Sequence, residues 1–118
     1  MIMKIDAIVR EEKFEDVKNA LMEIEVNGLT VSQVMGCGLQ RGYKESVQGM
    51  EVEPQTQPKI KFEIVVSSEE WAEKTIEAIK KAAYTGEFGD GKIFSYPVAS
   101  ATKIRTGETG YDAVQCQE

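Results

Sequence analysis

The most restrictive feature of the sequence is a hydrophobic period that changes twice along the chain, from two residues to about 3.6. Apolar residues occupy alternate positions over residues 2–9 and again over 59–66, which is the period of a half-buried strand. Each segment is followed by apolar residues at helical spacing. This spacing predicts amphipathic helices over residues 14–25 and 72–83, and Ser67 is placed to cap the second helix.

Two further segments have strand character. Residues 29–35 predict a strand that Gly36-Cys37-Gly38 interrupts, and residues 92–101 predict a strand in which Pro97 indicates an edge or a bulge. The order is therefore strand, helix, strand, strand, helix, strand. This order predicts one α+β domain over residues 1–118 with the ferredoxin-like βαββαβ arrangement, in which two helices cover one face of a four-stranded antiparallel sheet.

The other face of this sheet has no cover within the chain. It would carry Ile2, Ile8, Val34 and Val65, and an apolar surface of this kind is normally buried. We therefore expect self-association into a closed symmetric assembly. The strand pattern leaves the number of subunits open.

Composition excludes several classes of function. The chain has 118 residues, a mass of 13.1 kDa and a net charge of −6, which argues against general nucleic-acid binding and a polybasic membrane anchor. It lacks an apolar run of membrane-spanning length and a signal-peptide pattern. Two cysteines, Cys37 and Cys116, are too few for a disulfide framework, so we expect a cytoplasmic protein. The absence of histidine removes imidazole catalysis and histidine metal sites.

The segment from Gly38 to Pro58 has no periodic pattern and is rich in Gln, Glu and Gly. Loops of roughly 20 residues are long for a compact domain, where most connections have about four to six residues. Such a segment is either functional or a surface insertion without a role, and the pattern leaves both readings open.

The stretch Thr85-Gly-Glu-Phe-Gly-Asp-Gly-Lys92 is the strongest candidate for a binding site. Three glycines followed by a lysine can bring backbone N–H groups and a positive charge to an anion. It is not a P-loop, because the Gly-Lys-Ser/Thr ending and a following helix are missing. An ordinary helix-to-strand turn explains the glycines equally well.

Further cations lie outside this stretch. Lys103 and Arg105 are two residues apart, so at a strand end they would project from the same side and could bind phosphates, or they could be a solvated strand end. Lys59 is a third isolated cation, and Gln40 is a neutral oxygen donor. No acid–base dyad stands out, and we expect no enzymatic activity. Cys37 lies between two glycines and is interpreted as a small turn residue.

Six blocks of the sequence occur in this order in one known family. They are residues 4–10, 28–31, 36–42 (Gly-Cys-Gly-Leu-Gln-Arg-Gly), 58–61, 85–94 (Thr-Gly-Glu-Phe-Gly-Asp-Gly-Lys-Ile-Phe) and 104–108 (Ile-Arg-Thr-Gly-Glu). Over residues 2–113 the chain thereby resembles the PII signal-transduction proteins. Its Gly-Cys-Gly-Leu-Gln block is most similar to the subgroup that pairs with ammonium channels.

The resemblance implies a ferredoxin-like homotrimer that binds ATP or ADP between subunits, and 2-oxoglutarate together with Mg-ATP. Gln40 would be the Mg ligand that responds to 2-oxoglutarate, and Lys59 would pair with that ligand's distal carboxylate. Residues 38–58 would form the long T-loop that reports the bound ligand to a partner. The nucleotide would be held by Thr30, Gly36, Gly38, Glu63, Gly89, Asp90, Gly91, Lys92, Lys103 and Arg105.

The chain also departs from the family pattern. Val52 stands at the tyrosine that many relatives have uridylylated, and Gln48 at the arginine that relatives insert into an ammonium channel. Leu39 and Lys103 replace arginines near the phosphates, and Gln55-Thr56-Gln57 replaces apolar residues. The leading hypothesis is a sensor of adenine nucleotide and 2-oxoglutarate that regulates a nitrogen-related target, with an ammonium channel first and a nitrogenase, a transcription factor or another transporter as alternatives. A PII-like regulator retuned to another small effector is the second hypothesis.

Overall fold

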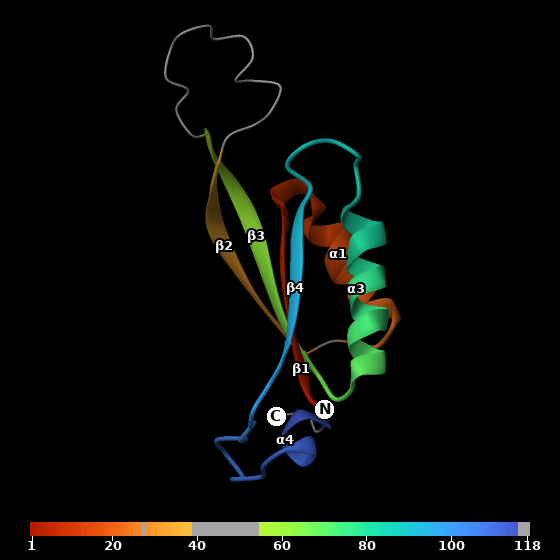
Figure 1. The fold of residues 1–118 in the computed structure, drawn as a ribbon, viewed down its shortest axis with the longest axis vertical. Coiled ribbons are helices and arrows are strands. Elements are labelled where there is room, and N and C mark those ends of the chain that lie inside the picture. Colours follow the sequence, from red (N-terminus) through yellow and green to blue (C-terminus); the bar gives the residue numbers. More distant parts are fainter. Residues whose placement is uncertain (27, 39–54, 116–118) are drawn as a thin grey trace, which may run out of the picture.

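The computed structural model describes residues 1–26, 28–38 and 55–115 and confirms the ferredoxin-like α+β fold (Figure 1). Four antiparallel strands form one sheet in the order β2-β3-β1-β4, and helices pack on it. The elements in chain order are β1 Met3–Arg10, the 3₁₀ turn η1 Glu11–Lys13, α1 Phe14–Glu23, β2 Leu29–Gly38, β3 Gln55–Val66, α3 Glu69–Ala83, β4 Gly91–Pro97 and α4 Tyr111–Gln115.

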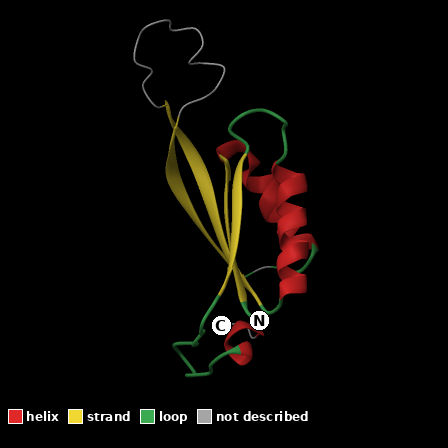
Figure 2. Cartoon of the chain, in the orientation of Figure 1, coloured by secondary structure: helices red, strands yellow, loops and turns green. Residues whose placement is uncertain are grey.

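One face of the sheet is covered by α1 and α3, as Figure 2 shows. The alternation predicted for the first strand is confirmed, because Ile5, Ala7 and Val9 are buried against these helices. Phe14 of α1 stacks on Phe62 of β3 with ring centroids 5.8 Å apart. The core therefore lies between the two helices and the central strands β1 and β3, and it fixes the strand ends on which the candidate site depends.

The opposite face of the sheet has no covering element among the described residues. Val65 is 38% exposed, and Phe94 and Tyr96 on the edge strand β4 are 51% and 40% exposed. Polar residues lie between these side chains: Tyr96 donates a hydrogen bond to Asp6 at 2.7 Å, and Lys4 Nζ lies 2.9 Å from Glu63 Oε1. The predicted uncovered face is thus present, and it is amphipathic.

The ribbon formed by β2 and β3 is longer than the sequence predicts. Gly36-Cys37-Gly38 does not interrupt β2, and β3 begins at Gln55 rather than at Lys59. The pairs Gly36↔Gln57 and Gly38↔Gln55 extend the ladder beyond the helices (Figure 1). Strand pairing uses backbone groups, so a ribbon with exposed side chains needs no apolar alternation. Gly38 and residues 55–58 of the predicted 38–58 loop are therefore strand residues, and its remaining residues, 39–54, lie outside the described residues.

Two element boundaries also differ from the predictions. Ser68, not Ser67, caps α3, and its hydroxyl accepts a hydrogen bond from the backbone N–H of Trp71 at 3.1 Å. The strand β4 ends at Pro97 rather than at residue 101. The polar composition of residues 103–118 predicts a loop or tail, and the short helix α4 occupies Tyr111–Gln115 within it. No helix in the described ranges is both long and apolar enough to span a membrane.

Candidate functional site

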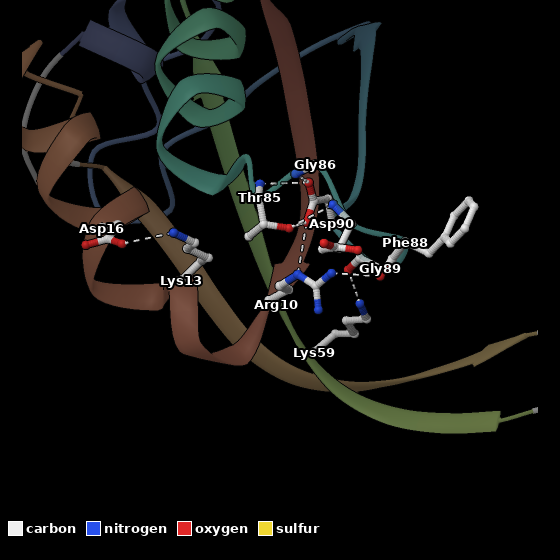
Figure 3. A network of polar contacts seen from close by, with 10 residues as sticks. Arg10, Lys13, Asp16, Lys59, Thr85, Gly86, Phe88, Gly89 and Asp90 are labelled. Carbon is white, nitrogen blue, oxygen red and sulfur yellow. Dashed lines mark hydrogen bonds and ion pairs between the residues drawn. The ribbon is translucent and has the colours of Figure 1, made fainter. Parts of the chain in front are cut away.

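The glycine-rich connection between α3 and β4 is folded around the Asp90 side chain (Figure 3). Asp90 Oδ2 accepts hydrogen bonds from the backbone N–H groups of Thr85 and Gly86 at 2.8 and 2.9 Å. Asp90 Oδ1 accepts from the Thr85 hydroxyl and from Arg10 Nε, the latter at 2.9 Å. The carboxylate thus closes the loop on itself.

These donors also determine the ionisation of Asp90. The hydrogen bond from the Thr85 hydroxyl, followed by those from the backbone N–H groups, holds the pKa of Asp90 well below its usual range, and Arg10 adds to the effect. A carboxylate so engaged stays negative and faces the inside of the loop. Its side chain is therefore suited to organising the loop rather than to contacting a phosphate.

Two cations from neighbouring strands contact carbonyl groups of the same loop. Arg10 Nη2 donates to the Phe88 carbonyl oxygen at 2.7 Å, and Lys59 Nζ donates to the Gly89 carbonyl oxygen. Arg10 and Lys59 are register partners in β1 and β3. Desolvation lowers the pKa of Lys59, and the adjacent charge of Arg10 lowers it further. A ligand carrying negative charge would relieve this repulsion between like charges.

The N–H groups of the loop differ from these carbonyl groups in their hydrogen bonding. Within the described ranges, the backbone N–H groups of Gly89 and Asp90 donate no hydrogen bond. Both Gly89 and Asp90 are only partly buried. Backbone N–H groups in this state, next to cationic side chains, are suited to binding an anion.

Glycine is required at two positions of the loop. Gly89 and Gly91 both have φ of +102°, a region that side chains disfavour. A Cβ on Gly91 would also lie 1.8 Å from the carbonyl oxygen of Ile8 in β1. Gly91 thus lets the end of the loop approach β1 closely. Lys92 follows in register with Ile8 on the uncovered face and is exposed.

A shallow cavity of about 100 Å³ lies at the base of the loop. Its wall is mostly apolar and comes from β1, α3 and β4, and Asp90 and Lys92 are among the residues that line it. The cavity is too small for a nucleotide, because small-molecule sites have volumes of about 300–1,000 Å³. This cavity alone therefore does not enclose a ligand of nucleotide size.

The residues expected around adenine and ribose fall in two places along the sheet. Thr30 pairs with Glu63 in the middle of the sheet, whose carboxylate accepts a hydrogen bond from Lys4. Gly36 lies farther along β2, beside Lys59: a Cβ on Gly36 would be 3.2 Å from Lys59 Cγ. Gly38 is the last residue of β2. The structure therefore groups Gly36 and Gly38 with the loop end, and separates Thr30 and Glu63 from it.

The segment between β4 and α4, which contains Lys103 and Arg105, lies at the opposite end of the molecule from the glycine-rich loop between α3 and β4 (Figure 1). The two side chains do not project from the same side: Lys103 is buried, with its ammonium nitrogen 3.6 Å from Glu108 Oε1, and Arg105 is exposed. The cause is a tight turn closed by the bridge Thr102↔Thr109. A single chain does not bring these cations to the loop.

Two participants were missed by the sequence reasoning, and four of its positions cannot be placed. Arg10 appeared there only within a family block, and Thr85 only as the first residue of the glycine-rich stretch, with no role of its own. An arginine at the end of a strand and a threonine five residues before Asp90 are nevertheless visible signals. Gln40, together with Leu39, Gln48 and Val52, lies outside the described residues.

Comparison with known proteins identifies the family. The family model described as "Nitrogen regulatory protein P-II" matches residues 2–108. The chain belongs to the P-II family. A P-II relative from the archaeon Methanothermobacter thermautotrophicus, named "Nitrogen regulatory protein P-II 1", is 51% identical over 111 residues, which cover 94% of this chain and 96% of the relative.

Solved P-II structures share the fold. A GlnK–ATP complex from B. subtilis has a TM-score of 0.77 and 38% identity, with 95% of this chain and 96% of the GlnK chain covered. Arabidopsis thaliana PII bound to citrate has a TM-score of 0.77 and 36% identity, with 99% of this chain and 93% of the PII chain covered. One P-II relative thus binds a nucleotide and another binds a polycarboxylate.

Proposed function

We propose that this P-II protein is a non-enzymatic sensor of ATP, ADP and 2-oxoglutarate that regulates a nitrogen-assimilation target by direct contact. The observation that carries the proposal is the polarity of the glycine-rich loop. Its Phe88 and Gly89 carbonyl groups are held by Arg10 and Lys59, while the N–H groups of Gly89 and Asp90 have no partner among the described residues. Such a loop is suited to binding phosphate oxygens.

In this proposal the phosphates bind to the backbone of Gly89, Asp90 and Gly91 and to the ammonium group of Lys92. The Asp90 carboxylate takes no part in ligand contact, because it is engaged with Thr85, Gly86 and Arg10. The ATP complex of B. subtilis GlnK, a protein with 38% identity, supports a nucleotide as the ligand. Phosphate esters are also the ligands that backbone N–H groups and lysine commonly bind together.

The rest of the nucleotide site comes from a neighbouring subunit in a homotrimer. Lys103 and Arg105 lie at one end of the chain and the glycine-rich loop at the other (Figure 1), so a head-to-tail contact between two copies would bring them together. A head-to-tail contact of this kind forms a closed trimer when each copy is rotated by a third of a turn from the last. Thr30, Glu63, Gly36 and Gly38 would then line the base and ribose. The amphipathic uncovered face supplies the apolar surface that trimer formation would bury.

The second effector, 2-oxoglutarate, would bind beside the phosphates with Mg. Lys59 would pair with its distal carboxylate, in exchange for the contact that Lys59 makes with the Gly89 carbonyl oxygen. Within the described ranges, no group of three acidic, cysteine or histidine side chains could hold a metal ion. A Mg ion would therefore depend on Gln40, the phosphates and the effector. The citrate complex of Arabidopsis PII supports the binding of a polycarboxylate.

Residues 38–58 would transmit the bound state to the target, and an ammonium channel is the target we propose first. The protein would act in the cytoplasm and be recruited to the membrane by that partner. Each effector could shift the T-loop only by the difference in its affinity for two loop states. Val52 excludes uridylylation at the position where relatives have a tyrosine. Gln48, in place of an arginine, removes a charge that relatives use in the channel.

Isothermal titration calorimetry tests the proposal. The pure protein is titrated with ADP, with ATP, and with 2-oxoglutarate in the presence and absence of Mg-ATP. We expect nucleotide binding and a 2-oxoglutarate signal that requires Mg-ATP. Absence of nucleotide binding would refute the proposal. Nucleotide binding without a 2-oxoglutarate response would favour the alternative, a P-II regulator retuned to another effector.

The role of Gln40 can be separated in the same assay. Gln40→Leu should abolish the 2-oxoglutarate signal and leave ADP binding unchanged, because ADP binding needs no contact from that amide. Gln33→Leu serves as the matched control, since Gln33 is exposed on β2. Equal loss of both ligands in Gln40→Leu would contradict the assigned role.

A further inference from the structure

Arg10, the last residue of β1, attaches the sheet to the glycine-rich loop at two points. Its Nε donates to Asp90 Oδ1 at 2.9 Å, and its Nη2 donates to the Phe88 carbonyl oxygen at 2.7 Å (Figure 3). The acceptors are 80 and 78 residues away in sequence. The Arg10 side chain is 19% exposed, so it is held within this contact rather than extended into solvent.

The contact with the Phe88 carbonyl determines how the next N–H group is oriented. In a planar trans peptide the carbonyl and the following N–H point in opposite directions, and the described chain has no cis peptide. Arg10 therefore turns the N–H of Gly89 away from itself. By the same geometry, Lys59 turns the N–H of Asp90 away by holding the Gly89 carbonyl. Neither of these two N–H groups has a hydrogen-bond partner among the described residues.

The arrangement requires an arginine and not only a positive charge. Two acceptors of different kinds, a carboxylate and a carbonyl, are bound by separate nitrogens of one rigid planar group. A lysine presents its donors from a single nitrogen on a flexible stem and cannot reproduce this fork. Glycine at position 89 leaves room for the group, since a Cβ there would be 3.3 Å from Arg10 Nη2.

We infer that Arg10 is a positioning residue for the anion site: it orients the Gly89 N–H toward the phosphate without contacting the ligand. The inference rests on the proposed function, because it concerns the same loop. In this inference Arg10 contributes to anion binding indirectly, by holding the peptide plane between Phe88 and Gly89. Arg10 also supports Asp90, which keeps the start and the end of the loop together.

The test compares Arg10→Lys and Arg10→Gln with the wild type. Two measurements are made: the amide resonance and hydrogen exchange of Gly89 by NMR without ligand, and the dissociation constant for ADP by calorimetry. Lys18→Gln is the matched control, because Lys18 pairs with Glu15 on α1 at 2.9 Å and does not contact the loop. Circular dichroism establishes that each variant is folded, and Asp90→Asn removes the other end of the contact if Arg10→Gln does not fold.

Both Arg10 variants should shift the Gly89 resonance and weaken ADP binding by about tenfold or more, the effect of losing one charge-assisted hydrogen bond. Lys18→Gln should change neither value. ADP binding by Arg10→Lys at wild-type affinity would overturn the inference, since charge alone would then suffice. Weakened binding with an unchanged Gly89 resonance would also overturn it, because it would indicate direct ligand contact. If the wild type binds no nucleotide but the Gly89 resonance still shifts in the Arg10 variants, the proposed function fails and the orienting role of Arg10 stands.

Discussion

Gly91→Ala tests the claim that the loop and β1 must approach one another as closely as the structure shows. The added Cβ would lie 1.8 Å from the Ile8 carbonyl oxygen and 2.9 Å from its carbon. Both are backbone atoms of β1, a central strand whose partners are β3 and β4. No rotation of a side chain can relieve the contact, so the start of β4 must move.

The magnitude follows from two separate costs. A non-glycine residue at positive φ costs about 1–2 kcal/mol, and overpacking that moves the backbone costs about 1–3 kcal/mol more. Gly107 provides a control for the first cost alone, because its φ is +77° and a Cβ there would meet nothing within 4 Å. Gly91→Ala should therefore destabilise by about 2–5 kcal/mol and Gly107→Ala by about 1–2 kcal/mol, out of a typical total of about 5–15 kcal/mol.

Urea unfolding followed by circular dichroism, at equal protein concentrations, measures both variants. The midpoint of Gly91→Ala should fall well below that of Gly107→Ala, and its ADP affinity should fall as well because the loop is displaced. Equal midpoints for the two variants would show that β4 does not approach Ile8 as described. That result would remove the structural reason for a glycine at position 91.

Three other expectations can be measured on the same protein. The lowered pKa of Asp90 means that its stabilising contribution is complete above the ordinary carboxyl value near 4 and declines as pH falls from there toward the lower folded value. In urea unfolding from pH 7 to 2.5, the difference in unfolding free energy between wild type and Asp90→Asn should stay constant down to about pH 4 and narrow below it; a difference that stays constant down to pH 2.5 would contradict this. Tyr96→Phe removes the hydrogen bond to Asp6 and should lower the thermal midpoint by roughly a few degrees; an unchanged midpoint would show that the bond contributes nothing. Lys59→Gln should weaken 2-oxoglutarate binding by roughly tenfold or more, since a charged hydrogen bond is lost, while ADP binding should be less affected. Calorimetry measures both affinities, and a larger loss for ADP than for 2-oxoglutarate would assign Lys59 to the nucleotide.

The sequence predicted the fold wherever burial imposes a period. Ile5, Ala7 and Val9 alternate because one face of β1 packs on the helices. The same reasoning failed at the outer end of the β2–β3 ribbon, where the pairing continues from Gly36↔Gln57 to Gly38↔Gln55 and the paired Cys37 and Thr56 are exposed. Backbone pairing there leaves no mark on the hydrophobic pattern.

The candidate site was predicted less completely, for a different reason. The glycines and Lys59 were recognised from residue type, but the partner of each polar group depends on register between distant strands. Arg10 meets Phe88 and Asp90 only because β1 lies beside β4 and β3. Sequence spacing also placed Lys103 and Arg105 on one side, whereas the turn that contains them buries Lys103 and exposes Arg105.

The net charge of −6 and the anion-binding loop are compatible because charge is arranged locally. Arg10 and Lys59 lie next to each other, and their repulsion is offset by one carboxylate and two carbonyl groups. Asp90 faces inward, so it balances the arginine without presenting its charge to a ligand. Removing Asp90 would therefore increase the positive charge of the site and yet weaken its binding, because the N–H groups would lose their orientation. A gain in positive charge together with weaker anion binding would distinguish a site that depends on backbone geometry from one that depends on charge alone.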